Sequence, residues 1–271
     1  MSAFRALQFN MQFGQVWDHH DPDHGRIDLD LSIAEIRAQN ADIIFLQEVE
    51  QARPKGEQLD PPPNHTLLRS AFGDYDSFFS YPKIDPHELP FGIGLCILSR
   101  TPLLNTVRVD LPSPTIEFEF QGERRVPTDR LLIGAHTTVA GRELRIFNAH
   151  LLAFFMLNAS SDIHTGQRRR VLGELSASSA PTLLGGDFNV SRHETLLREF
   201  SDAGYETVQS KAVTWRRRAY VLDHLFYSRE LRPMRHVVKP TPASDHHMVI
   251  ADFEFADGPV TQGGRRRSRR E

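Results

Sequence analysis

Apolar residues along this chain recur in short runs, and many of these runs alternate with polar residues. Alternation with a period of two, enriched in β-branched and aromatic residues, is typical of β-strands. The pattern predicts about ten strands, at residues 4–10, 42–49, 94–99, 115–120, 130–139, 143–151, 181–189, 212–216, 221–228 and 246–255. Strands therefore dominate the predicted fold.

A few segments have the spacing of amphipathic helices, with apolar residues three and four positions apart. They are residues 29–40, 165–178 and 192–200. Segments rich in Pro, Gly and charge, without periodicity, predict long surface loops at residues 17–25, 53–65 and 81–92. Many strands with few helices predict an α/β (α+β) fold in which two packed sheets are flanked by helices. No internal repeat or linker is evident, so we expect one domain at residues 1–257 and a basic, disordered tail at 258–271.

The formal net charge of −3 conceals an acidic body and a basic tail. Five of the 32 basic residues but only one of the 35 acidic residues lie in residues 263–271, so residues 1–262 carry a net charge of −7. A domain with this net negative charge is not expected to bind polyanions non-specifically. A phosphate substrate is therefore expected to need local basic patches or a metal ion. The arginines at 265–270 predict either a weak, non-specific contact with such a substrate or a solubilising end.

The single cysteine and the N-terminus indicate the compartment. Cys96 lies in an apolar run, which excludes an internal disulfide and favours a buried, inert thiol. The first residues show no basic region followed by a long apolar run, and no segment approaches the length of a membrane span. We therefore expect a cytoplasmic protein without a membrane span, and a monomer, since no protein partner is evident.

The segment PTLLGGDFNVS, residues 181–191, places polar residues where a buried strand is expected. Gly185 and Gly186 would let the backbone bend and approach another group closely. Because side chains alternate along an extended chain, Asp187 and Asn189 are expected to point the same way. The alternative for this segment alone is an Asx turn, in which both side chains bond their own backbone.

Polar residues recur at or near the ends of the predicted strands, which favours a shared site. These polar residues are Asn10, Glu48, His150, Asp187, Asn189, Asp223, Asp245 and His246. If the strand ends converge, the carboxylates would repel one another unless a cation compensates them. The oxygen-rich set without cysteine favours Mg²⁺ or Mn²⁺ over a thiolate zinc site.

The motifs LQFNM, LQEV, NAHL, GGDFN, LDHLF and SDHHMV, in this order, resemble the endonuclease/exonuclease/phosphatase superfamily, whose fold is DNase I-like. The resemblance spans residues 4–255. It implies a four-layered sandwich, with helices outside two packed, mainly antiparallel sheets and the site at one edge. It also implies that Glu48 is the main metal ligand, with Asn10 beside it and Asp245 near the metal.

The same resemblance implies roles for the other residues. Asp187 and Asn189 would orient the attacking water and hold the phosphate, or help to carry a second metal. His246, oriented by Asp223, would act as a base or as a donor to the phosphoryl oxygens, and His150 matches an additional histidine of several branches. These residue types suit the chemistry, because an anionic phosphodiester needs a cation, a positioned water and a proton acceptor.

Several other features have ordinary readings. His224 and His247 are expected to face away from the site. Loop 17–25 is rich in Asp and His, but loops of this composition are more often solvated than bound to a metal. The letters of SDHHM also match the DHH phosphoesterase motif, but the other acidic motifs of that family are not evident. The segment PFGIGLCILSR, residues 90–100, offers no carboxylate just before the strand ending at Ser99, so a DNase-like His–Glu pair around His150 is not expected.

The sequence leaves two classes of substrate open for a metal-dependent phosphoester hydrolase. Nucleic acid is favoured by Arg216, Arg217 and Arg218, which precede Asp223 and are expected to contact backbone phosphates. Arg130 is a further candidate for a phosphate contact, or an ordinary surface arginine at a strand end. The alternative substrate is a small or lipid phosphate ester, as for a phosphatase or phospholipase. A silent binding module is disfavoured because no site residue is missing.

Overall fold

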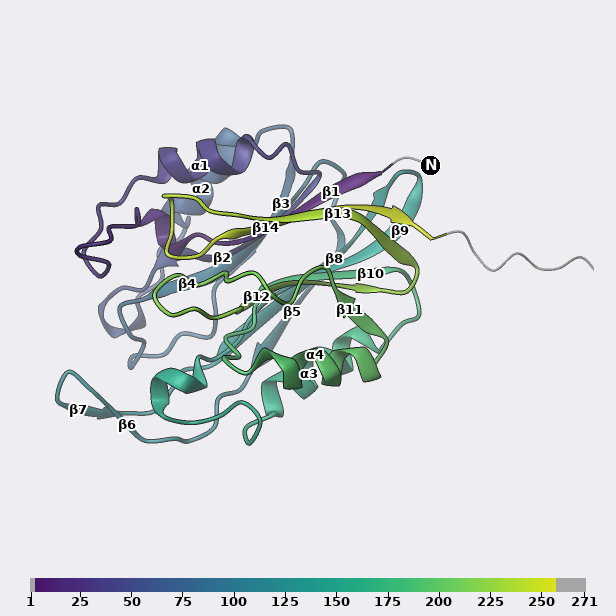
Figure 1. The fold of residues 1–271 in the computed structure, drawn as a ribbon. Coiled ribbons are helices and arrows are strands. Elements are labelled where there is room, and N and C mark those ends of the chain that lie inside the picture. The colour runs from purple at the N-terminus through teal and green to yellow at the C-terminus, as the bar shows by residue number, and fades with distance from the viewer. Residues whose placement is uncertain (1–2, 257–271) are drawn as a thin grey trace, which may run out of the picture.

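The computed structural model describes residues 3–256, and the predicted basic tail lies outside the described residues. Two six-stranded sheets stack face to face, with helices on the outer side of each (Figure 1). The first sheet has the order β13 (Leu231–Lys239), β14 (Met248–Phe255), β1 (Phe4–Asn10), β2 (Ile43–Gln51), β4 (Gly92–Ser99) and β3 (Asp76–Ser80). The second has the order β11 (Tyr205–Thr207), β12 (Asp223–Ser228), β10 (Thr182–Asp187), β9 (Arg142–His150), β8 (Arg130–Val139) and β5 (Leu104–Leu111).

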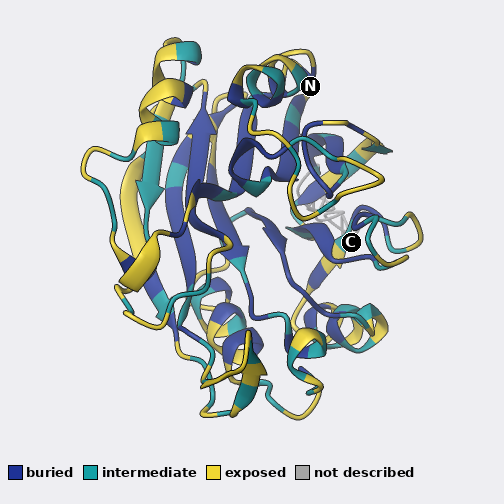
Figure 2. Cartoon of the chain, turned by 90° about the vertical axis from the view of Figure 1, so that its left-hand side faces the viewer, coloured by how far each residue is buried: buried dark blue, intermediate teal, exposed yellow. Residues whose placement is uncertain are grey.

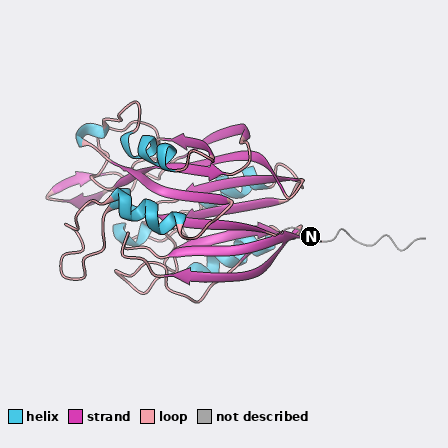
Figure 3. Ribbon diagram, turned by 90° about the horizontal axis from the view of Figure 1, so that it is seen from above, coloured by secondary structure: helices cyan, strands magenta, loops and turns pink. Residues whose placement is uncertain are grey.

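Each sheet is mixed and mainly antiparallel, as expected. Its one parallel pair lies in the interior of the sheet: β1 with β2 in the first and β9 with β10 in the second. All other neighbours in these two sheets pair antiparallel. The strands run along the length of the molecule (Figure 3). Because the two strands of each parallel pair run in the same direction, their carboxyl ends lie at the same end of the sheet.

Four layers follow from where the apolar faces of the strands point. One cluster, including Phe4, Phe45 and Ile146, fills the space between the sheets. Alternate residues of the same strands pack outward, against α1 (Leu29–Arg37) and α2 (Pro63–Ala71) on the first sheet and against α3 (Gly166–Leu175) and α4 (His193–Asp202) on the second. Figure 2 shows the result: buried residues follow the interior strands, and exposed residues lie on loops, on outer helix faces and on strands at the sheet edges.

Capping and backbone geometry explain where helices α1 and α2 begin. The side chain of Asp28 accepts a hydrogen bond from the N–H of Leu31 and caps α1. The sequence predicted a loop as far as residue 65, but helix α2 begins at Pro63. The fixed φ of proline suits a first helical position. The N–H of His65 in its first turn donates to Glu50 on β2, at 2.9 Å. Tertiary contacts therefore support this short helix.

Three short 3₁₀ turns and one small hairpin complete the described part of the chain. They are η1 (Gln12–Gly14), η2 (Pro54–Gly56), η3 (Phe154–Leu157), and β6 (Phe118–Phe120) with β7 (Glu123–Arg125). The predicted loop at 17–25 is irregular, as expected. The predicted loop at 81–92 is irregular as far as Gly92, where β4 begins. Within residues 3–256, no helix has the length and apolar character needed to cross a membrane.

The predicted strand at 212–216 is wrong. Trp215 makes only isolated bridges, to Tyr220 and His246. The hydroxyl of Thr214 accepts hydrogen bonds from the N–H groups of Leu222 and Asp223, so this segment folds back on the start of β12 instead of joining a sheet. Within this segment Trp215 is buried, next to His246 and bonded to Asp245, although it joins no sheet.

Candidate active site

The predicted site residues of the two parallel pairs converge at one edge of the sandwich. Asn10 ends β1, His150 ends β9 and Asp187 ends β10. The Nδ2 atom of Asn10 donates to Glu48 Oε1 at 2.9 Å and to Asp187 Oδ2 at 3.0 Å. A single amide from the first sheet therefore holds a carboxylate from each sheet.

Glu48 is aimed at this edge by a bulge in β2. Its φ is +52°, and the pairing with β4 shifts between Gln47 and Glu50. Such a bulge reorients a side chain that strict alternation would place on the other face. A Cβ atom at Gly92 on β4 would overlap the side chain of Glu48, so only glycine fits opposite it. The sequence reasoning missed Gly92.

Three of these residues could hold a cation together. Glu48, His150 and Asp187 offer ligand atoms that lie within 4.8 Å of one another. His150 Nε2 is 3.8 Å from Glu48 Oε1 and 3.7 Å from Asp187 Oδ2. Burial raises the pKa of Glu48, and burial with the nearby Asp223 raises that of Asp187 to about 8. Two desolvated carboxylates, without a thiolate, are hard oxygen donors of the kind that Mg²⁺ or Mn²⁺ prefers.

The imidazole of His150 stays neutral in this setting. Burial, and then the charge of Arg130, lowers the pKa of His150 to about 3. A neutral ring nitrogen can accept a hydrogen bond or bind a metal, whereas an imidazolium could do neither. His150 is therefore available as a ligand or an acceptor.

His246 forms the second half of the site, together with Asp223. His246 Nδ1 lies 2.8 Å from Asp223 Oδ2 and donates to it, since a carboxylate can only accept. Burial alone would lower the pKa of His246, but the charges of Asp223 and Asp187 outweigh it and raise this pKa to about 10. The Nε2 atom is 3.7 Å from Asp187 Oδ2. An imidazolium N–H therefore faces the other carboxylate of the site.

The GGDFN segment combines both readings that the sequence left open. Gly185 and Gly186 stay within β10 and do not bend it, but a Cβ there would overlap the Phe45 ring or the carbonyl of Ala149. Asn189 lies beyond the strand in the left-handed region, with φ of +50°, so the alternation argument does not apply to it. Its N–H donates to Asp187 Oδ1 at 3.0 Å, an Asx-type turn.

Asn189 and Asp245 support the site from its flanks. The side-chain amide of Asn189 donates to the carbonyl of Leu151 at 3.0 Å and so ties the end of β10 to the end of β9. Asp245 Oδ2 accepts hydrogen bonds from Trp215 Nε1 at 3.0 Å and from Arg217 Nε. Among the described residues, neither group of side chains that could share an ion includes Asp245. The predicted roles of Asn189 and Asp245 stay predictions.

A model of the Endonuclease/Exonuclease/phosphatase family matches residues 7–246, which run from β1 to His246. The chain belongs to this family. Its similarity to the curated UPF0294 protein plu0699 of Photorhabdus laumondii is 28% identity over 126 residues, 45% of this chain and 47% of that protein. The match therefore spans about half the length of this relative.

Solved structures of the same family share the fold. The chain is similar to an endonuclease/exonuclease/phosphatase from Beutenbergia cavernae, with a TM-score of 0.73, 20% identity, and coverage of 96% of this chain and 73% of that chain. It is also similar to the human Nocturnin catalytic domain with bound sulfate, with a TM-score of 0.66, 20% identity, and coverage of 94% and 95%. These likenesses confirm the predicted DNase I-like sandwich.

The arginines predicted to bind substrate differ in their surroundings. Arg217 also bonds Asp23 and the carbonyl of Pro22, and so links the Asp- and His-rich loop to Asp245. Arg216 lies over the Trp17 ring and donates to the carbonyl of Thr241. By contrast, Arg218 is exposed. Their predicted contacts with substrate stay predictions.

Arg130 lies at the start of β8, next to the end of β9. Its Nη1 atom is 3.4 Å from Thr128 Oγ1 and 3.6 Å from Glu88 Oε1. Its charge lowers the pKa values of both Glu48 and His150. Arg130 therefore belongs to the electrostatic surroundings of the family site, although a substrate contact is untested.

The sequence reasoning also missed three buried amides behind the site, Gln8, Gln47 and Asn148. Gln8 and Asn148 lie two positions before Asn10 and His150, so each points to the same side of its strand as a site residue. Gln47 directly precedes Glu48. The period-two pattern that predicted the strands contains this signal.

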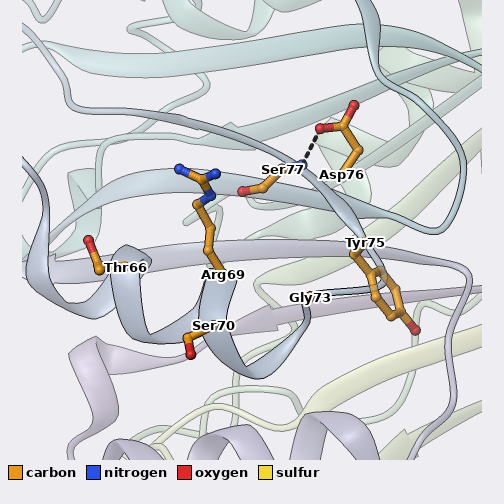
Figure 4. Close-up of a pocket in the computed structure, with 7 residues that line it drawn as sticks. All are labelled: Thr66, Arg69, Ser70, Gly73, Tyr75, Asp76 and Ser77. Carbon is orange, nitrogen blue, oxygen red and sulfur yellow. Dashed lines mark hydrogen bonds between the residues drawn. The ribbon is translucent and has the colours of Figure 1, made fainter.

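Two other candidates are separate from this edge. In the described part of loop 17–25, no set of side chains is placed to share a metal, and His24 simply pairs with Asp21 at 2.8 Å. A surface hollow of about 430 Å³ lies between α2 and β3 (Figure 4). It is lined by Thr66, Arg69, Ser70, Gly73, Tyr75, Asp76 and Ser77. Its lining contains none of the residues that converge with Asn10 and Asp187.

Proposed function

We propose that this chain is a divalent-metal-dependent phosphoester hydrolase that cleaves its substrate by direct attack of water. The observation that supports it most is the convergence of Asn10, Glu48, His150 and Asp187 with the His246–Asp223 pair at one edge. Membership of the Endonuclease/Exonuclease/phosphatase family agrees with this chemistry.

Glu48 and Asn10 would hold the ion, with Asp187 and His150 close enough to contribute. Mg²⁺ or Mn²⁺ in such a site would neutralise negative charge on the phosphoryl oxygens. Asn10 keeps the two carboxylates at a fixed separation, and Gly92 leaves the space that Glu48 needs. The bulge in β2 therefore positions the principal ligand.

His246 is assigned as the donor to the phosphoryl oxygens. Its Nδ1 proton is committed to Asp223, and the neighbouring carboxylates favour the protonated ring, so Nε2 also carries a proton to donate. Asp187 is then the acceptor that orients the attacking water, because its Oδ2 atom faces both His246 and His150. A bound cation would lower the raised pKa of this carboxyl and keep it ionised for that role. No covalent intermediate is needed.

Nucleic acid is our first choice of substrate, and a small or lipid phosphate ester is the second. Arg218 is exposed and directly follows Arg217, which bonds Asp245, so it would suit a backbone phosphate. The second choice is supported by Arg216 and Arg217, which already bond groups of the protein. An acidic body, with a net charge of −7 over residues 1–262, suits a substrate with few phosphates.

A substrate panel in Mg²⁺ tests this proposal. It comprises duplex and single-stranded DNA, RNA, inositol phosphates, sphingomyelin and a bis-aryl phosphodiester. We expect turnover of the aryl diester and faster turnover of one nucleic acid, with His136→Ala as a control distant from the site. Turnover of inositol phosphate or sphingomyelin alone would replace nucleic acid with the second choice. Hydrolysis of none of them would contradict the proposal.

A further inference from the structure

A chain of buried amides crosses between the two sheets and ends on the carboxylate of Asp223. Gln8 Nε2 donates to Asp223 Oδ1 at 2.9 Å and to Gln47 Oε1 at 2.7 Å. Gln47 Nε2 donates to Asn148 Oδ1 at 2.7 Å. Asn148 Nδ2 then donates to backbone carbonyls of β2 and β4, at 2.8 and 2.9 Å. All four side chains are fully buried.

The orientation of each amide in this chain is determined by the groups at its two ends. Asp223 can only accept, and so can the two backbone carbonyls. Gln8 must therefore turn its NH₂ group toward Asp223, which makes Gln47 present its oxygen to Gln8 and its nitrogen to Asn148. Reversing any one amide would place two acceptors or two donors against each other. Only one arrangement satisfies the chain.

Gln8 contributes to this chain only as a donor. Both of its N–H groups are used, and its Oε1 has no hydrogen-bond partner among the described residues. An unpaired buried carbonyl is costly, so a glutamine would be a poor choice for packing alone. Its position is explained by the donor it supplies to Asp223.

This donor restricts the second half of the site. Asp223 Oδ1 is bonded by Gln8, while Oδ2 accepts from His246 Nδ1 at 2.8 Å. With both oxygens engaged, the carboxylate cannot rotate without losing a hydrogen bond. The orientation of the imidazole, and therefore the direction of its Nε2 atom toward Asp187 at 3.7 Å, depends on that restriction.

We propose that Gln8 is a positioning residue for the Asp223–His246 pair. It acts through Asp223, and its side-chain bonds are to Asp223 and Gln47 and not to Glu48 or Asn10. The effect on turnover rests on the proposed phosphoesterase function, whereas the effect on the His246 ring does not.

Gln8→Leu removes both donors and keeps a similar volume. With the aryl diester in Mg²⁺, we expect kcat to fall about 10- to 100-fold, as for loss of a buried hydrogen bond to a charged group, with KM and the Mg²⁺ dependence unchanged. Gln39→Leu is the matched control, since Gln39 is a buried glutamine near Arg5, at the opposite end of β1. A fall in kcat for Gln39→Leu of the same size, or an unchanged kcat for Gln8→Leu, would overturn the proposal.

A double-mutant cycle tests whether Gln8 acts through Asp223. In an Asp223→Asn background, Gln8→Leu should cause no further loss of kcat, because the carboxylate that it positions is gone. Losses that multiply fully would show that Gln8 acts by another route and would reject the proposal.

An NMR measurement of the ring proton of His246 needs neither substrate nor metal. The Nδ1–H resonance, assigned by its loss in His246→Ala, should shift or broaden in Gln8→Leu and stay in place in Gln39→Leu. An unchanged resonance in Gln8→Leu would contradict the inference, even if the chain hydrolysed no substrate in the panel.

Discussion

Asp187 is the residue at which the two halves of the site meet. It belongs both to the group with Glu48 and His150 and to the group with Asp223 and His246. Its Oδ2 atom lies 3.7 Å from a ring nitrogen of each histidine and 3.0 Å from Asn10 Nδ2. A change at this one carboxylate should therefore affect water, ion and proton donor together.

Asp187→Asn and His246→Ala should each lower kcat by at least about 10²-fold on the best substrate, because both groups act on the transition state. Asp187→Asn keeps the side-chain volume, and we expect its unfolding midpoint to change little. His246→Ala leaves the buried Asp223 carboxylate without its partner, so we expect a lower unfolding midpoint for that variant. Turnover and thermal unfolding are measured on the same preparations. A variant with near wild-type turnover would disprove the role assigned to that residue.

At the scale of residues, the sequence predicted six side chains that converge at the site but not the buried amides behind them. Asn10, Glu48, His150, Asp187, Asp223 and His246 lie together as the motif order implied. Gln8 and Asn148 were missed because uncharged amides inside apolar strands were not read as part of the polar edge. The left-handed Asn189 could not be placed by alternation, which holds only within a strand.

At the scale of elements, the bulge in β2 near the start of β4 is decisive. It places Glu48 against Gly92, where no side chain fits. A sequence pattern does not reveal this pairing, because Gly92 lies 44 positions after Glu48 and looks like an ordinary loop glycine.

Gly92→Ala should displace Glu48 and weaken Mg²⁺ binding by at least about tenfold, since removing or misplacing a charged ligand weakens a hard-cation site. Gly173→Ala is the matched control, because nothing lies within 4 Å of a Cβ at that helical position. We expect the control to be neutral or slightly stabilising. Calorimetric titration with Mg²⁺ measures both variants, and wild-type affinity in Gly92→Ala would show that Glu48 does not need this space.

His65 joins α2 to β3 and predicts a pH dependence of stability. Its ring stacks on Phe79 and lies 2.7 Å from Ser77 Oγ, and burial, with Arg69 second, lowers its pKa to about 4. Below the unfolded value of about 6.5 the unfolded chain binds more protons, so this contribution to stability is present above pH 6.5 and is lost as pH falls through 4. In urea titrations at pH 7.5 and 4.5, His65→Gln should lose less stability on acidification than the wild type. An equal loss of stability in His65→Gln and the wild type would contradict this role of His65.

The elements that were not predicted from the sequence lack a clear apolar pattern. β13 and β5 are edge strands whose side chains are largely exposed, so they lack the apolar alternation of interior strands. β3 is short and half-buried, and helix α2 has few apolar residues. Interior strands such as β1 and β8 were predicted with their observed bounds, because both of their faces pack against apolar layers.

At the scale of the whole molecule, the site depends on the packing of both sheets. The first sheet supplies Asn10 and Glu48, the second supplies His150, Asp187 and Asp223, and the loop between β13 and β14 supplies His246. The chain order of these residues, from 10 to 246, explains why six weak motifs together predicted the family. The single domain, the monomeric state and the cytoplasmic location stay predictions.

Arg218→Ala should distinguish the two substrate classes. On an oligonucleotide, loss of one phosphate contact should weaken binding and reduce the slope of log K against log salt by about 0.7 to 0.9, while turnover of the aryl diester stays unchanged. Arg124→Ala, an exposed arginine on the β6–β7 hairpin, is the control. Unchanged binding of the oligonucleotide in Arg218→Ala would favour the small-ester substrate.

Dependence on a divalent ion held by Glu48 is tested most directly by a metal titration of aryl diester hydrolysis. After treatment with excess EDTA, we expect no turnover by the wild type, and recovery when Mg²⁺ or Mn²⁺ is restored. Glu48→Gln, which keeps shape and removes one formal charge, should need at least about tenfold more Mg²⁺ and reach a lower maximal rate. Full wild-type turnover in excess EDTA, or a titration of Glu48→Gln that matches the wild type, would contradict a metal-dependent mechanism at this site.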